Sequence, residues 1–124
     1  MTVLVDSFAW VEYFKGTQKG EAVRALVDGG EPLAVSVVNL IEIYVKITRE
    51  KNEKTAEERA KFIMQRCEVV GVDEEIAFSA AREKISRNLG LADAIIYATA
   101  KIKKAKIITG DMHFRGFENV IFLD

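Results

Sequence analysis

The two residue types that most often build metal and redox sites are almost absent. The 124-residue chain has one cysteine and one histidine. A disulfide within the chain or a cysteine zinc site needs at least two thiols, so the sequence excludes both, together with any His/Cys metal cluster. Charge of one sign is not in excess either, because 19 acidic residues face 18 Lys and Arg for a net charge of −1. This balance argues against a strongly basic nucleic-acid coat, but not against a nucleic-acid enzyme that draws positive charge from a bound metal.

Long hydrophobic runs are also missing. The first apolar run, residues 3–5, ends at Asp6 and is too short for the core of a signal peptide. A membrane helix needs roughly 18 apolar residues without charges, and the longest candidate, which starts at Leu33, is interrupted by Glu42 and Lys46. We therefore expect a soluble protein of a reducing cytoplasm with no membrane partner.

What the sequence does contain is an alternation of short apolar runs with longer segments of helical periodicity. The apolar fraction is 49%, which is enough for a real core, and the length fits one domain over residues 1–124. Strands are predicted over residues 2–5, 33–35, 68–70, 106–109 and 120–123. Helices are predicted over 7–15, 18–28, 36–50, 55–65, 73–90 and 91–104. Such an alternation predicts an α/β fold with an open parallel sheet covered by helices on both faces.

Two of these helices carry more detailed predictions. Thr55 and Glu58 have the spacing of a capping box, so Thr55 is expected to begin its helix. Asp73 is expected to cap the next helix, and Gly90 to end it. In that helix Ile76, Ala77, Ala80, Ala81 and Ile85 are expected to share the buried side.

Four acidic residues lie next to the predicted strands. Asp6 directly follows the first strand and Asp111 follows the fourth, while Glu42 lies in the helix after the second strand and Asp93 in the helix that leads to the fourth. Ligands of open α/β sheets bind outside the carboxyl ends of the strands, where these acids can converge. Clustered carboxylates repel each other unless a cation intervenes, and oxygen ligands favour Mg²⁺ or Mn²⁺. Such ions can clamp a phosphodiester and activate water.

Each acid taken alone also has a structural explanation. Asp6 could be a turn or N-cap residue, Asp93 could favour the helix dipole, and Asp111 beside a glycine could be a turn acid. Glu42 could belong to a thin solvent-exposed stripe of an otherwise apolar helix, or it could point into a cleft with Asn39 one turn before it. The metal-site hypothesis therefore depends on all four acids together.

Four segments then carry a family resemblance. They are residues 3–14, which contain Asp6-Ser7; residues 36–42, which end at Glu42; residues 91–100, which contain Asp93; and residues 108–114, with Thr109-Gly110-Asp111. In this order the sequence resembles the PIN-domain nucleases, and within them the VapC-type toxins of toxin–antitoxin pairs. The resemblance covers nearly the whole chain.

The resemblance implies a PIN-like three-layer α/β/α sandwich with a five-stranded parallel sheet. It also implies an endoribonuclease that depends on Mg²⁺ or Mn²⁺, an RNA substrate, a small antitoxin as inhibitor and a homodimer. The catalytic and metal-binding set that it carries over is Asp6, Glu42, Asp93 and Asp111. Three further positions match residues that order the pocket, namely Ser7, Thr109 and, as a polar neighbour of the second acid, Asn39. No catalytic role is assigned to His113.

Other magnesium enzymes fit the sequence less well. A haloacid-dehalogenase-like phosphatase needs a second aspartate where this chain has Phe8, and a receiver domain needs an acceptor aspartate where only Asp73 lies nearby. The sequence also has no P-loop. Within the PIN-like class, a non-toxin nuclease of RNA processing and a catalytically silent binding module remain as alternatives.

Two groups of side chains outside the acidic set are assigned to structure. Trp10, Tyr13 and Phe14 lie at turn spacing, and we expect core or dimer packing from them and not base stacking. Basic residues flank the Asp93 segment, and we expect solvated helix faces there and not a track for RNA. They are Arg82, Lys84, Arg87, Lys101, Lys103, Lys104 and Lys106.

Overall fold

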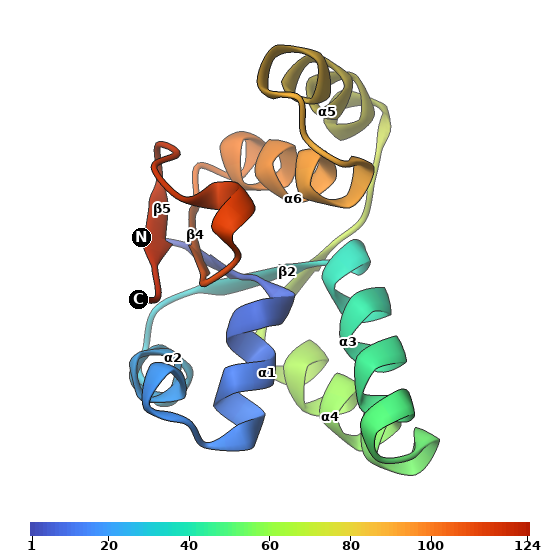
Figure 1. The fold of residues 1–124 in the computed structure, drawn as a ribbon, viewed down its shortest axis with the longest axis vertical. Helices are drawn as coiled ribbons and strands as arrows, with labels where there is room; N and C mark the ends of the chain where they lie inside the picture. Colours follow the sequence, from blue (N-terminus) through green and yellow to red (C-terminus); the bar gives the residue numbers. More distant parts are fainter.

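A five-stranded parallel sheet organises the chain in the computed structural model, which describes all residues 1–124. Its strands are β1 (Val3–Val5), β2 (Leu33–Ser36), β3 (Glu68–Val70), β4 (Lys106–Thr109) and β5 (Val120–Phe122). Their order across the sheet is β3-β2-β1-β4-β5, with every neighbouring pair parallel (Figure 1). The predicted sheet is therefore confirmed, with strand boundaries within one residue of those expected.

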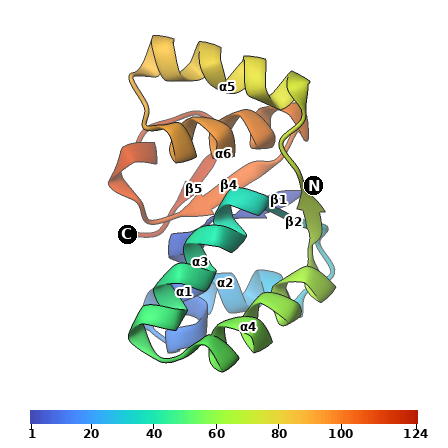
Figure 2. The same cartoon turned by 90° about the vertical axis from the view of Figure 1, so that its right-hand side faces the viewer.

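Helices cover both faces of this sheet. They are α1 (Ser7–Lys15), α2 (Gln18–Asp28), α3 (Val37–Glu50), α4 (Glu53–Arg66), α5 (Glu74–Arg87) and α6 (Leu91–Ile102), with a short 3₁₀ turn η1 (Met112–Phe114). Helices α5 and α6 lie on one face, whereas α1, α2 and α4 lie on the other and α3 packs beside α1 and α4 (Figures 1 and 2). The three-layer α/β/α sandwich is thus confirmed. None of the helices has the length and apolar character needed to cross a membrane.

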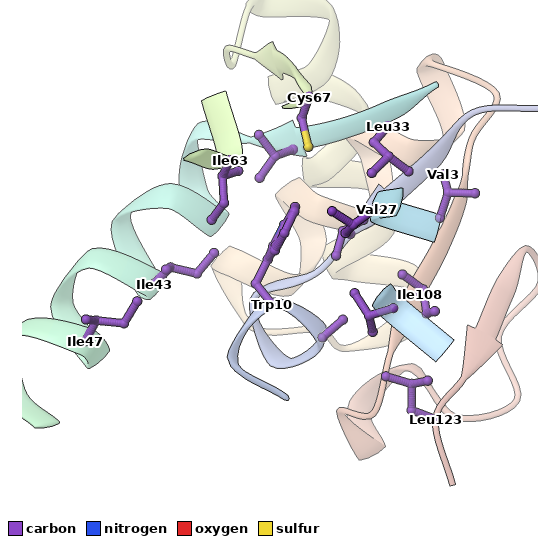
Figure 3. Packing of buried hydrophobic residues seen from close by; sticks show 14 of the residues in the cluster. Val3, Trp10, Val27, Leu33, Ile43, Ile47, Ile63, Cys67, Ile108 and Leu123 are labelled. Atoms are coloured by element: carbon purple, nitrogen blue, oxygen red, sulfur yellow. The ribbon is translucent and has the colours of Figure 1, made fainter. Parts of the chain in front are cut away.

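Alternate residues of the strands divide the core into two parts. Val3 and Val5 of β1 face α1 to α4, while Leu4 faces α5 and α6. Figure 3 shows the larger part, in which Trp10 is fully buried among apolar side chains from the sheet and its four helices. The ring of Phe14 stacks on Trp10 at 5.8 Å between centroids. Core packing of Trp10 is confirmed, and its burial leaves no ring face for a nucleic-acid base.

Three predictions about helices were wrong. Gly90 does not end α5, which finishes at Arg87 with Asn88 in the left-handed conformation as its C-cap, and Gly90 is instead the N-cap of α6. Helix α4 begins at Glu53, because Asn52 acts as its N-cap and its side-chain oxygen accepts a hydrogen bond from the backbone N–H of Thr55 at 2.7 Å. Asn is at least as favourable as Thr at an N-cap, so the helix begins after Asn52 and not at Thr55. Of the five residues expected on the buried side of α5, Ala77 and Ala81 are exposed, and Ile85 is 84% exposed. It lies nine residues, or two and a half turns, after the buried Ile76, and therefore on the opposite side of α5.

The path of the chain through the sheet defines one special position. From β1 the chain moves to β2 and then β3, and it later returns to β4 on the other side of β1. The strand order therefore reverses at β1, and open α/β sheets bind their ligands outside the carboxyl ends of the strands at this switch point. Asp6 is the first residue after β1, so it lies where this rule places a site.

Candidate active site

Asp6 is a buried acid that is fixed from two sides. Its position is that of the α1 N-cap, but its side chain makes no capping hydrogen bond. Instead, Oδ2 accepts a hydrogen bond from Thr109 Oγ1 at 2.7 Å, and Oδ1 accepts one from Asn39 Nδ2 at 2.9 Å. The carboxylate is therefore held at the end of β1 by residues from β4 and α3, and helix capping does not explain it.

Burial makes this carboxyl group a weak acid. Loss of water solvation raises the pKa of Asp6 to about 6, although the Thr109 hydrogen bond opposes the shift. The negative charges of Glu42 and Asp111 raise the pKa of Asp6 further. Burial also raises the pKa of Asp93, with Asp111 as the next cause. Contacts connect these acids at one rim of the sheet. Ser7 links Asp6 to Glu42, and Thr109 links Asp6 to Asp111. His113 links Asp93 to Asp111.

Glu42 reaches the rim from the second turn of α3. Ser7 Oγ donates a hydrogen bond to Glu42 Oε1 at 2.6 Å and lies 3.4 Å from Asp6 Oδ1, so one hydroxyl group bridges two acids. Burial raises the pKa of Glu42, and the charges of Asp93 and Asp111 add to the rise, against the Ser7 hydrogen bond. The side chain of Glu42 is exposed, as the stripe explanation expects, but its carboxylate is hydrogen-bonded to Ser7 beside Asp6 and so lies at the acidic rim.

Asn39 connects the start of α3 to this cluster. Its Oδ1 accepts a hydrogen bond from the Ser36 backbone N–H at 3.1 Å, which completes a capping box. Its Nδ2 donates a hydrogen bond to Asp6. The side chain is fully buried, so both ends of the amide are used. Asn39, Ser7 and Thr109 each donate a hydrogen bond to an acid of the rim, and their role in ordering the pocket stays a prediction.

Asp111 is placed by the turn that follows β4. Its backbone N–H donates to Thr109 Oγ1 at 3.0 Å, and its own Oδ1 accepts from the His113 backbone N–H at 2.9 Å. The structural explanation for this acid is therefore partly correct, because one oxygen caps η1. Glycine fits at position 110, between Thr109 and Asp111, because a Cβ on this residue would lie 2.3 Å from a ring carbon of Phe8.

His113 is the site residue that the sequence analysis missed. Its Nδ1 lies 2.8 Å from Asp93 Oδ2 and 3.3 Å from Asp111 Oδ1. The Asp93 hydrogen bond, with the charge of Asp111, raises the pKa of this imidazole. The only signal in the sequence was the two-residue spacing from Asp111 within one short turn. The structure thus places His113 at the acidic rim and not in an unrelated loop.

The rim offers suitable donors for a divalent cation. One ligand atom each from Asp93, Asp111 and His113 lie within 4.8 Å of one another. Asp6 and Glu42 are outside this tightest group, and the hydroxyl groups of Thr109 and Ser7 connect them to it. Carboxylate oxygens suit Mg²⁺ and Mn²⁺, and an imidazole nitrogen is compatible with the softer of the two. Burial is the largest cause of the raised carboxyl pKa values, and repulsion between the acids adds to it. A cation here would offset both.

Comparisons with known proteins support the fold and assign the family. The family model described as "PIN domain" matches residues 3–119. A toxin–antitoxin complex from Klebsiella pneumoniae superposes with a TM-score of 0.80 at 23% identity, covering 98% of both chains. VapC20 of Mycobacterium tuberculosis, described as a sarcin–ricin loop cleaving toxin, has a TM-score of 0.73 at 20% identity and covers 95% of this chain and 98% of its own. No curated protein sequence matches at a significant level.

Proposed function

The chain belongs to the PIN-domain family, and from this premise we propose that it is a metal-dependent endoribonuclease that acts as the toxin of a toxin–antitoxin pair. The observation that carries the proposal is the meeting of four carboxylates at one sheet rim. They come from segments as far apart as Asp6 and Asp111, and each of Asp6, Glu42 and Asp93 has a raised pKa. Such a cluster is costly without a cation and is suited to binding one.

Asp6 and Asp93 are proposed as the principal ligands of Mg²⁺ or Mn²⁺. Glu42 and Asp111 complete the set, either directly or through water, because Mg²⁺ usually keeps several waters. When bound, the ion supplies Lewis acidity to the phosphodiester and activates water for attack at phosphorus. His113 Nδ1 adds a nitrogen donor beside Asp93 and Asp111.

The surrounding polar residues fix the orientation of the carboxylates by hydrogen bonds. Thr109 and Asn39 each hold one oxygen of Asp6, so that carboxylate does not rotate freely. Ser7 occupies Glu42 Oε1, which leaves Oε2 to accept a proton from an attacking water. A carboxylate whose pKa is raised toward neutrality is the better general base, and Glu42 has a pKa raised by burial and by its acidic neighbours.

The structural likeness supports a proposal about partners. The Klebsiella pneumoniae neighbour is a toxin–antitoxin complex, and VapBC2 of Rickettsia felis, with a TM-score of 0.78 at 16% identity over 98% of this chain and 97% of its own, was solved on a fragment of promoter DNA. We propose a small antitoxin for this chain too, with a basic segment that lies over the acidic rim. RNA as substrate, a homodimer as the assembly and the cytoplasm as the place of action belong to the same proposal.

A cleavage assay tests the proposed activity. Purified protein is incubated with a panel of defined RNAs in EDTA, in Mg²⁺ and in Mn²⁺. We expect cleavage only with metal, and its loss in Asp93→Asn but not in Asp28→Asn, which removes an exposed acid far from the rim. Cleavage that persists in EDTA, or full activity of Asp93→Asn, contradicts the proposal. RNA binding with no cleavage under any metal favours the silent-module alternative.

Growth of a host cell separates a toxin from a nuclease of RNA processing. Expression of the wild-type chain is expected to arrest growth, and co-expression of the product of an adjacent small gene to relieve the arrest. The Asp93→Asn variant should permit growth without that second protein. Normal growth with active wild-type enzyme favours RNA processing.

A further inference from the structure

Several lysines lie away from the acidic rim, at the other end of the strands or in ion pairs with other acids. Lys106 begins β4, and its backbone N–H donates to Thr2 at the amino end of the parallel sheet, opposite the rim. Lys101 pairs with Glu83 at 3.1 Å and Lys103 pairs with Glu68 at 2.9 Å. These side chains therefore do not reach a ligand that is bound at Asp6.

A different set of cations lies on the rim side. A groove of about 420 Å³ is formed by one face each of α1 and α3, which lie side by side in Figures 1 and 2. Ser7 and Glu42 belong both to the rim and to this groove. Its remaining lining is Phe8, Val11, Glu12, Lys15 and Lys46. The groove is thus continuous with the acidic site.

The two lysines of this groove lie farther from the rim than Glu42, and its other acid, Glu12, accepts a hydrogen bond from Thr17 Oγ1 at 2.9 Å. On α3, Lys46 lies one turn beyond Glu42, or about 6 Å along the axis, and on α1, Lys15 lies two turns beyond Ser7, or about 12 Å. The hydrogen bond from Lys46 lowers the pKa of Glu50, and the positive charges of Lys15, Lys46 and Lys51 lower it further, so these lysines lie near the same outer end.

Lys46 is free to change partner. Its ion pair with Glu50 has a distance of 3.0 Å, and the two side chains are 49% and 41% exposed. An exposed pair of this kind contributes little stability, on the order of 0–1 kcal/mol. A phosphate group is therefore able to displace Glu50 at small cost.

We propose that this groove binds the backbone of single-stranded RNA beside the scissile phosphate, with Lys46 contacting the nearer phosphate and Lys15 the next one. The inference rests on the proposed nuclease function and adds the path of the substrate. A cavity of this size suits a small ligand, so it admits part of one strand and not a duplex. Phe8 and Val11 supply an apolar floor for a base.

The experiment measures RNA affinity as a function of salt. A fluorescein-labelled single-stranded RNA of about 12 nucleotides is titrated with the full chain in EDTA, and anisotropy gives Kd at a series of NaCl concentrations. The test variant is K15Q/K46Q. The matched control is K104Q/K106Q. It loses the same charge from exposed residues at the amino end of the strands, opposite the acidic rim. Circular dichroism verifies that both variants are folded.

Each phosphate contact on a single strand contributes about 0.7 to the slope of log K against log salt. Loss of two contacts is therefore expected to reduce the slope by about 1.4 and to weaken binding at 0.1 M salt by about 25-fold. The control is expected to stay within about twofold of the wild type. Equal slopes for the test variant and the control overturn the inference, as does wild-type binding without salt dependence.

Two further outcomes separate this inference from the proposed function. If the wild type cleaves RNA with metal but K15Q/K46Q binds RNA as the control does, the groove assignment is wrong and the nuclease stands. If K15Q/K46Q loses RNA affinity but the wild type cleaves no RNA, the groove is supported and the nuclease is wrong. Loss of an antitoxin's affinity with an unchanged RNA slope assigns the groove to a protein and overturns the inference.

Discussion

Neutralising Asp6 should stabilise the metal-free protein at neutral pH. The folded protein holds a proton on this group more tightly than the unfolded chain does, because its pKa is raised from 3.8 to about 6. Folding therefore becomes less favourable as pH rises through this interval, and the loss is complete above the folded pKa. A shift of two units corresponds to about 3 kcal/mol of unfolding free energy at pH 7 and to about 1 kcal/mol at pH 4.5.

The Asp6→Asn substitution removes this penalty while keeping the size of the side chain. Its carbonyl oxygen still accepts from Asn39, but its amide faces Thr109, and the lost hydrogen bond costs about 1 kcal/mol at any pH. The two effects roughly cancel at pH 4.5. At pH 7 the variant is expected to be about 2 kcal/mol more stable than the wild type.

Urea unfolding in EDTA at the two pH values measures this difference. Asp28→Asn, at an exposed position, serves as the control and should change stability by the same small amount at both pH values. A variant of Asp6 that is destabilised equally at pH 4.5 and pH 7 would refute the reasoning, because the carboxylate would then carry no desolvation penalty.

Three further outcomes follow from individual contacts. Gly110→Ala should cost about 1–3 kcal/mol in urea unfolding, because its Cβ would meet the Phe8 ring at 2.3 Å, and a companion Phe8→Ala should restore part of that loss. Arg66→Ala should cost about 2–3 kcal/mol in the same assay, since its guanidinium donates to backbone carbonyls of residues 26, 27, 29 and 31; an unchanged midpoint would show that these bonds contribute nothing. Ser7→Ala should raise the pKa of Glu42 further, because the Ser7 hydrogen bond lowers it; a carboxyl NMR titration in EDTA that moves down or not at all would contradict this.

Much of the fold was predictable because local patterns and the parallel topology agree. Apolar runs separated by helical segments predicted all five strands, and the rule that ligands meet the carboxyl ends of strands predicted that Asp6 and Asp111 converge. The errors were local. Asn52 and Thr55 both suit an N-cap, and spacing alone did not decide between them. Ile85 was assigned to the apolar side of its helix without regard to its nine-residue distance from Ile76.

The details of the site depended on contacts that no local pattern reveals. Asp6 accepts hydrogen bonds from residues 33 and 103 positions away, Asn39 and Thr109, and only the folded chain shows which oxygen each one takes. His113 was given no catalytic role because many PIN-domain relatives carry another polar residue at its position. Its approach to Asp93, 20 residues away, arises when η1 folds over the start of α6.

Binding of Mn²⁺ tests the central claim most directly. The ion is titrated into the metal-free wild type, Asp93→Asn and Asp28→Asn, and free Mn²⁺ is followed by electron paramagnetic resonance, with Mg²⁺ as competitor. We predict that the wild type and Asp28→Asn bind alike, that Mg²⁺ displaces the ion, and that Asp93→Asn binds at least about tenfold more weakly. A wild-type protein that binds no Mn²⁺, or an Asp93→Asn variant that binds it as tightly as the wild type, would contradict the account.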